Sequence, residues 1–166
     1  MAKSRTEKGE VLAKLKAVFT TSSSVAFVNF HKLTVKQGET LRRAMTTAGS
    51  GYLVVKKTLI AKSLEGTKVT GVSPNLTGEI AVAYLTAGSD ITAPAREVFG
   101  FEKKFEKTVQ LIGGIFEGFF KSRDEMVAIA SIPPRETLLA QFVNLVQSPI
   151  QRLVVGLSEI AKKKSY

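Results

Sequence analysis

The sequence predicts an α+β fold: a compact α/β domain with a mixed or antiparallel, ferredoxin-like sheet, followed by a long C-terminal helix. Segments with strand-like alternation and segments with helical spacing take turns along the first 132 residues. Two consecutive prolines, Pro133 and Pro134, then break the chain, and about thirty residues of continuous helical spacing follow. A hydrophobic content of 44% is ordinary for a protein with a buried core. We therefore expect two parts, residues 1–132 and residues 133–166.

The first half of the predicted domain alternates helices and strands. Strands are indicated where β-branched and aromatic residues alternate with small or polar ones, and helices where apolar residues recur three and four positions apart. Serine and threonine serve as helix caps, and glycine marks a helix end. In chain order the predicted elements are a helix capped by Ser4 and broken by the serines at 22–24, a strand over 24–31, a helix capped by Thr34 that ends at Ala48 and Gly49, a strand over 51–56 and a short helix over 58–64.

The second half continues the alternation after a loop over residues 67–75, which is rich in Thr, Gly, Ser and Pro. Pro94 falls in the first turn of a helix, where a missing N–H matters little. Gly113 and Gly114 indicate a bulge or close packing within a strand. The predicted elements are a strand over 76–85, a helix opened by Asp90 or Thr92, a strand over 109–116, a short edge piece at Phe119 and Phe120, and a small helix opened by Ser122 and ended by the two prolines.

Residue types that many enzymes need are missing. The chain has no cysteine and one histidine, so it has no disulfide, no thiolate zinc site and no cysteine nucleophile. His31 alone supplies neither a metal site nor a histidine acid-base pair. Residues 66–71 are not a phosphate loop, because the final Lys-Ser/Thr and the preceding strand are lacking. We expect a protein that is not an enzyme and that uses no metal and no cofactor.

The sequence also indicates where the protein works. Its first ten residues lack the apolar core of a secretory signal, and no apolar run approaches the roughly 20 residues that span a bilayer. We expect a cytoplasmic protein.

The net charge of +10 is concentrated at one end of the chain. Residues 1–68 hold 13 basic and 4 acidic side chains (+9), residues 69–134 hold 6 and 8 (−2), and residues 135–166 hold 5 and 2 (+3). Such a surplus attracts polyanions, and lysines beside a helix start suit phosphate groups. Within this first segment, which also contains Lys8 and Lys36, we predict a nucleic-acid-binding surface formed by a set of basic residues. These are Lys56, Lys57 and Lys62 first, Lys32, Arg42 and Arg43 second, and the N-terminal Lys3 and Arg5 third.

Base reading is less expected than phosphate contact. Phe27, Phe30 and Tyr52 could stack on bases, but strand spacing favours a place in the core. Aromatic motifs of the RNP type are absent, which favours contacts to phosphate and to RNA shape. His31, at the end of the first strand, is interpreted as a structural or RNA-facing residue.

The last helix contains an internal repeat of eleven residues. Eleven residues make three helical turns, so both copies lie on one side and form a single apolar stripe. The stripe consists of Leu139, Phe142, Val143 and Val146 in the first copy and Ile150, Leu153, Val154 and Leu157 in the second.

The stripe has two interpretations. It could pack on the protein's own core, as amphipathic helices commonly do. However, a helix of thirty residues would be about 45 Å long, more than a domain of this size can cover. We therefore predict a partner site with two copies of one partner, and a bend between them at Pro149.

A family resemblance runs along the chain. Residues 33–67 read LTVKQGETLRRAMTTAGSGYLVVKKTLIAKSLEGT, and EIAVAYL, the IFEG segment at 115–118, SIPPRETLLAQ and the repeated helix follow. Together these segments resemble the family of bacterial large-subunit ribosomal protein ten, the universal ribosomal stalk-base proteins. The family usually has Asn before the Thr-Leu of the third helix start, where this chain has Lys57. The hydrogen bond of that Asn side chain is therefore not carried over.

The resemblance implies both partners and location. It implies an α/β RNA-binding domain that binds the stalk-base region of large-subunit rRNA beside ribosomal protein eleven. It further implies a C-terminal helix that carries dimers of the acidic stalk protein seven/twelve, which recruit the translation GTPases. With the repeat, we expect two dimers on each chain and a ribosome-bound protein without membrane contact.

Two other functions remain open from the sequence. A free basic RNA-binding regulator or RNA chaperone would explain the charge but leave the repeat without a role. A membrane-surface protein would lay the last helix, with its lysines at 162–164, on anionic lipid. Truncation at Pro133 tests the first alternative and liposome flotation the second.

Overall fold

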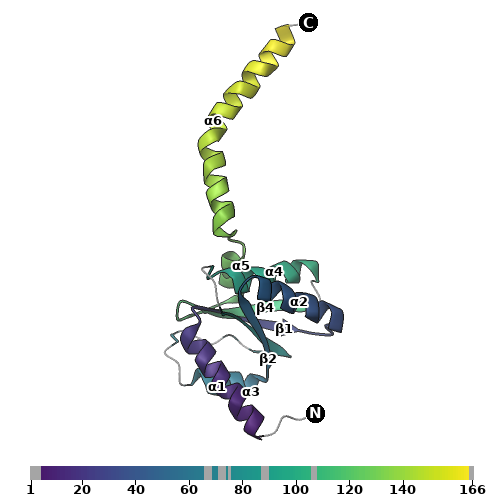
Figure 1. Cartoon of the computed structure of the whole chain (residues 1–166), viewed down its shortest axis with the longest axis vertical. Coiled ribbons are helices and arrows are strands. Elements are labelled where there is room, and N and C mark those ends of the chain that lie inside the picture. The colour runs from purple at the N-terminus through teal and green to yellow at the C-terminus, as the bar shows by residue number, and fades with distance from the viewer. Residues whose placement is uncertain are drawn as a thin grey trace. The chain divides into compact units, whose positions relative to one another are not determined.

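The computed structural model describes residues 5–65, 69–70, 74, 76–86, 90–105 and 108–164. The chain divides into two compact units, Met1–Ile132 and Pro133–Tyr166 (Figure 1). Among the described residues, the first unit holds the sheet and five helices, and the second holds one long helix.

The first unit is built on a five-stranded sheet with the order β2-β3-β1-β4-β5, in which every neighbouring pair is antiparallel. Because β1 and β2 both run antiparallel to β3, they are parallel to each other and are joined by a helical crossover. β3 and β4 both run antiparallel to β1, which lies between them, so they too are parallel to each other and are joined by a helical crossover. These two split βαβ units are the ferredoxin-like arrangement, so the predicted fold class is confirmed. The strands are β1 (Ser24–Phe30), β2 (Ser50–Val55), β3 (Ile80–Leu85), β4 (Val109–Phe116) and β5 (Phe119–Lys121).

Helices cover both faces of the sheet. Figure 1 shows α1 and α3 together on one side and α2, α4 and α5 on the other. The five helices of this unit are α1 (Arg5–Thr21), α2 (Val35–Thr47), α3 (Lys57–Leu64), α4 (Ala93–Lys104) and α5 (Arg123–Ala130).

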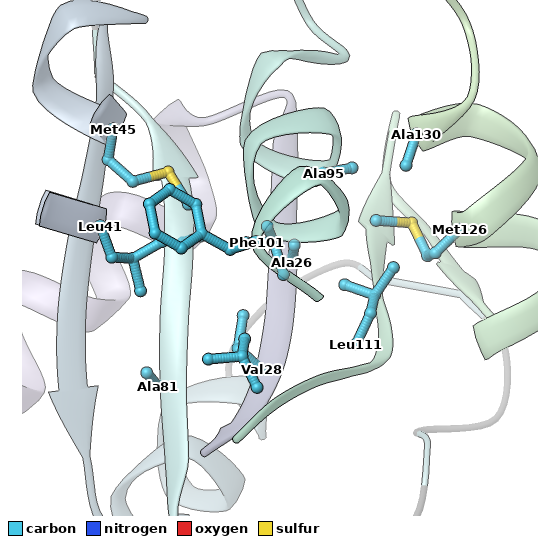
Figure 2. Packing of buried hydrophobic residues seen from close by; sticks show 13 residues of the cluster. Ala26, Val28, Leu41, Met45, Ala81, Ala95, Phe101, Leu111, Met126 and Ala130 are labelled. Atoms are coloured by element: carbon cyan, nitrogen blue, oxygen red, sulfur yellow. The ribbon is translucent and has the colours of Figure 1, made fainter. Parts of the chain in front are cut away.

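Alternation along the central strand β1 gives each face its own core. Val25 and Phe27 point to the α1 and α3 side, whereas Ala26 and Val28 point to the other. All four are at most 1% exposed. Figure 2 shows the second of these cores, where side chains from α2, α4 and α5 meet over the sheet. Unit one is therefore a three-layer structure whose sheet is covered by helices on both faces.

The glycine pair in β4 allows close packing, as predicted. The register with β1 shifts at Ile112, which is a bulge. A Cβ at Gly113 would lie 2.7 Å from the Lys121 carbonyl oxygen, and one at Gly114 would meet the Val25 carbonyl oxygen. The nearly buried Glu102 accepts a hydrogen bond from the Leu111 N–H at 3.1 Å beside this bulge. The Leu111 N–H beside the bulge is therefore hydrogen-bonded to a side chain of α4.

Glu102 also joins α4 to α5. Its second carboxylate oxygen accepts from Arg123 Nη2 at 2.8 Å. One acidic side chain therefore connects the two helices that close this face and the strand below them.

Caps begin and end the helices largely where the sequence predicts. Thr34 and Gln37 form a reciprocal capping box before α2, and Ser122 forms one with Glu125 before α5. After α2, Gly49 has a φ of +68°, which suits glycine at a helix stop. The Ser4 cap of the first helix lies outside the described residues.

One predicted segment needs correction. The strand predicted over 76–85 begins only at Ile80, because the chain turns at Gly78, whose φ is +83°. In the predicted loop over 67–75, most residues are outside the described part. However, Thr70 forms an isolated parallel bridge with Phe119. The predicted edge piece is confirmed as β5, which includes Lys121 as well.

The second unit is the single helix α6 (Arg135–Lys164), with the bounds that the sequence predicts. Pro149 lies inside it and cannot donate to the Leu145 carbonyl oxygen. The Ser148 hydroxyl donates to that oxygen instead, at 3.1 Å. In Figure 1 the helix axis changes direction part-way along its length, as the proline predicts.

Candidate functional sites

One end of the sheet gathers positive charge. The parallel strands β1 and β2 both finish there, so the residues that follow them meet at the same edge. Lys32 follows β1, and Lys56 and Lys57 follow β2. Lys36 stands in the first turn of α2, which starts at this end. All four lysines are exposed. This basic end, formed by Lys32, Lys36, Lys56 and Lys57, is available to a polyanion.

The backbone at Lys32 is unusual. Its φ is +52°, a left-handed conformation that a residue with a side chain adopts at a cost of roughly 1–2 kcal/mol. The turn places Thr34 two residues later to cap α2. A tight reversal between β1 and α2 therefore holds this lysine at the sheet end.

A hollow of about 560 Å³ opens at the basic end. It lies where the start of α1, the start of α3 and the ends of β1 and β2 come together. Its lining is apolar except for a few polar groups, among which Lys8 joins the two lysines at the start of α3. The lining residues are Lys8, Val11, Phe30, Val54, Val55, Lys56, Lys57, Thr58, Leu59, Gly78, Glu79 and Ile80.

The structure does not bring all predicted cations to this end. Arg42 and Arg43 lie further along α2, which covers the opposite face from α3. Lys62 is exposed in the last turn of α3. Lys3 lies outside the described residues, and Arg5 begins α1, although its side chain is not described.

The predicted core role of the strand aromatics is confirmed for Phe27, which is fully buried. Tyr52 packs against the core beside α2. Burial of its ring raises the pKa of the Tyr52 hydroxyl to about 12, although the nearby Arg42 opposes that rise. Phe30 packs against the same core and also lines the hollow. His31 is exposed, and its backbone N–H donates to the Thr108 carbonyl oxygen at 2.8 Å.

The repeat on α6 forms a second candidate site. All eight stripe residues, from Leu139 to Leu157, are 50–66% exposed. Monomeric proteins rarely leave apolar patches larger than a few hundred Å² in water. Within the second unit, the described residues offer the stripe no core on which to pack. Other apolar residues of the same helix are exposed as well but do not belong to the predicted repeat, namely Leu138, Leu145, Val155 and Ile160.

The described residues contain no group of three or more His, Asp or Glu side chains placed to hold a metal ion. Among the described helices, α6 included, none has the length and apolar content that crossing a membrane requires. The candidate sites are thus a basic surface and an apolar helix.

Comparison with known proteins matches both units to one family. The family described as ribosomal protein L10 matches residues 3–103, and the ribosomal protein uL10 C-terminal region matches residues 132–165. The large ribosomal subunit protein uL10 of Shouchella clausii is 31% identical over 164 residues, covering 99% of this chain and 97% of the relative. The protein of the same name from Bacillus cereus is 30% identical over 164 residues with the same coverage.

Proposed function

This chain belongs to the ribosomal protein L10 family, a family of structural proteins of the large ribosomal subunit and not of enzymes, and we propose that it acts as a two-ended scaffold. Its first unit anchors it to large-subunit rRNA at the base of the stalk. Its second unit, α6, carries the stalk proteins. Any effect on GTP hydrolysis is indirect, through the factors that the stalk delivers.

The basic end of the sheet supports the anchoring role. Exposed lysines from two strand ends converge there, and phosphate contacts supply most sequence-independent affinity for nucleic acid. Lys56 and Lys57 are the first choice for this contact. Lys32 contributes at the same end of the sheet. Arg42 and Arg43 on α2 and Lys62 on α3 would extend the RNA-binding surface along these two helices. The N-terminal Lys3 and Arg5 are the third choice.

The observation that carries the proposal is the exposed stripe on α6. A thirty-residue helix whose eight repeat residues all face water has no stabilising core of its own. Helical stability in proteins comes mostly from packing of an apolar face, so this helix needs a partner. An apolar partner helix lying along the stripe supplies that packing.

The repeat supports two equivalent binding positions. Each copy offers four apolar residues at the same spacing, and Pro149 separates the copies. Two dimers of the acidic stalk protein seven/twelve are therefore the proposed partners of α6. The net charge of +3 over residues 135–166 suits an acidic partner. Ribosomal protein eleven is the proposed neighbour of unit one at the stalk base.

Truncation tests the two ends separately. Residues 1–132 and the full chain are each mixed with stalk-base rRNA and with stalk protein, and the complexes are measured by native mass spectrometry. We expect the truncated chain to keep RNA binding and to lose every stalk dimer. Retention of stalk dimers by residues 1–132 would contradict the scaffold. A full chain that binds RNA but no stalk protein would indicate a free RNA-binding regulator instead.

A further inference from the structure

The hollow at the basic end has two chemically different parts. Its floor is apolar and includes Val11, Leu59 and Ile80, which pack at the edge of the core beneath α1 and α3. Its rim carries Lys8, Lys56 and Lys57. An apolar floor below a cationic rim suits a ligand with a flat, poorly charged body and an anionic backbone.

A phosphate group does not fit the interior of this hollow. The apolar side chains of the floor offer phosphate no hydrogen bonds, and the negative charge of Glu79, one of the lining residues, opposes a second anion. The rim is different, since Lys8, Lys56 and Lys57 form no ion pair within the described part of the chain. Phosphates therefore belong on the rim.

A nucleobase fits the interior better. Single-stranded RNA is recognised largely through bases that leave the stack and pack against protein side chains. The hollow of about 560 Å³ is within the usual range of small-ligand pockets, and its apolar lining can pack against the face of a base. Glu79 supplies an acceptor for the amino or imino group of a base.

We propose that this hollow receives one unstacked base of the bound RNA, while Lys8, Lys56 and Lys57 hold the phosphates that flank it. The inference rests on the proposed RNA-anchoring role of the first unit and makes it more specific. It assigns unit one a contact with a single-stranded or bulged nucleotide in addition to contacts with a duplex backbone.

The direct test is nuclear magnetic resonance of the full chain with labelled methyl groups, bound to a stalk-base rRNA fragment. We expect nuclear Overhauser contacts from base protons to the methyl groups of Val11, Leu59 and Ile80. The methyl groups of Leu138 and Leu145 on α6 serve as an internal reference and should show none. Contacts from ribose protons alone, or none at the hollow, would overturn the proposal.

A variant that fills the hollow gives a second test. Thr58 is exposed and lines the hollow, so Thr58→Trp should occupy the space of a base. We expect RNA affinity to fall about tenfold, the size of one lost stacking contact, with the salt dependence unchanged. The base-to-methyl contacts should disappear as well. Wild-type affinity with those contacts retained would overturn the proposal.

Two controls separate this inference from the RNA role on which it rests. Thr40→Trp makes the same change at an exposed position of α2 outside the hollow and should bind as the wild type does. The double change Lys56→Ala and Lys57→Ala should lower the salt dependence. If it does so while Thr58→Trp binds normally, the base pocket is wrong and the RNA surface stands. If it changes nothing, the RNA surface itself is wrong.

Discussion

The two units use apolar side chains in opposite ways. In the first unit Phe27 is fully buried between β1 and the helices α1 and α3, whereas Phe142 on α6 is 65% exposed. Both residues stand in segments of regular apolar spacing. The sheet of unit one has a helical layer over each face, whereas no other described element of the second unit covers the stripe. Apolar periodicity therefore predicts that a face will be buried, and does not say by which molecule.

The largest expected effect on stability comes from comparing the same change, phenylalanine to alanine, in each of the two units. Phe27→Ala should destabilise unit one by about 3–5 kcal/mol, because it opens a cavity in a closed core. Phe142→Ala should change the unfolding free energy of unit one by less than about 0.5 kcal/mol, since its side chain already faces water. Chemical denaturation followed by tyrosine fluorescence measures both. A large loss for Phe142→Ala would mean that α6 packs on unit one in solution.

Charge substitutions on α6 test whether its two copies are independent. Phe142→Asp should remove one stalk dimer and Leu153→Asp the other, because each change leaves an unpaired charge in an apolar seam. Native mass spectrometry should then count one dimer on each variant and two on the wild type. Unchanged RNA binding is the control.

Two results would contradict the hypothesis that the two copies bind independently. Release of both dimers by either substitution would show that the two positions are coupled across Pro149. Three dimers on the wild-type chain would contradict the repeat count itself.

A charge change at the basic sheet end should alter a different property. The double variant Lys56→Ala and Lys57→Ala should weaken rRNA binding and lower the slope of log affinity against log salt by roughly two or less, about one for each phosphate contact. Stalk binding should be unaffected. The measurement is a filter-binding series from low to high salt.

The matched comparison is Arg42→Ala with Arg43→Ala. These arginines lie on the helix that covers the other face, so a smaller change in slope is expected there. An equal or larger change would mean that the RNA surface follows α2 and not the sheet end.

Local patterns predict much of this structure because local interactions set it. The bounds of β4 and α6 and the cap at Thr34 follow from alternation, helical spacing and a capping side chain close in sequence. The predicted third strand is too long because its apolar residues continue past a turn at Gly78. Whether Gly78 continues the strand or turns with a positive φ depends on the fold around it, which the local sequence does not contain.

The candidate RNA site is only partly visible in the sequence for a similar reason. Charge counts and strand ends identify Lys56 and Lys57. They do not tell which face of the sheet each helix covers, and this separates Arg42 from those lysines. Lys8 meets them because α1 and α3 pack on the same face, a contact between segments about fifty residues apart. The hollow also depends on that packing, so no local pattern predicts it.

The smallest expected effect concerns how helices begin in the two units. Asp90 accepts hydrogen bonds from the Thr92 N–H at 3.3 Å and hydroxyl at 2.8 Å, and pairs with Arg96 at the start of α4. No ion pair of this kind lies at the start of α6 among the described residues. Burial alone would raise the pKa of Asp90, but the hydrogen bonds from Arg96 and Thr92 outweigh it and lower that pKa.

A carboxylate whose pKa is lowered in the folded state stabilises the protein above its ordinary pKa and loses this effect as the pH falls. Asp90→Asn should therefore lower the Tm of unit one by a few degrees at pH 7, and the difference should shrink as the pH falls from about 4, the ordinary pKa of an aspartate, through the lowered pKa of the folded state. Asp124→Asn, at an exposed position of α5, is the matched control and should matter less. Calorimetry at pH 7 and pH 3 gives both values. A Tm difference that stays constant between them would mean that Asp90 acts through its shape and not through its charge, and helix starts would then no longer distinguish the two units electrostatically.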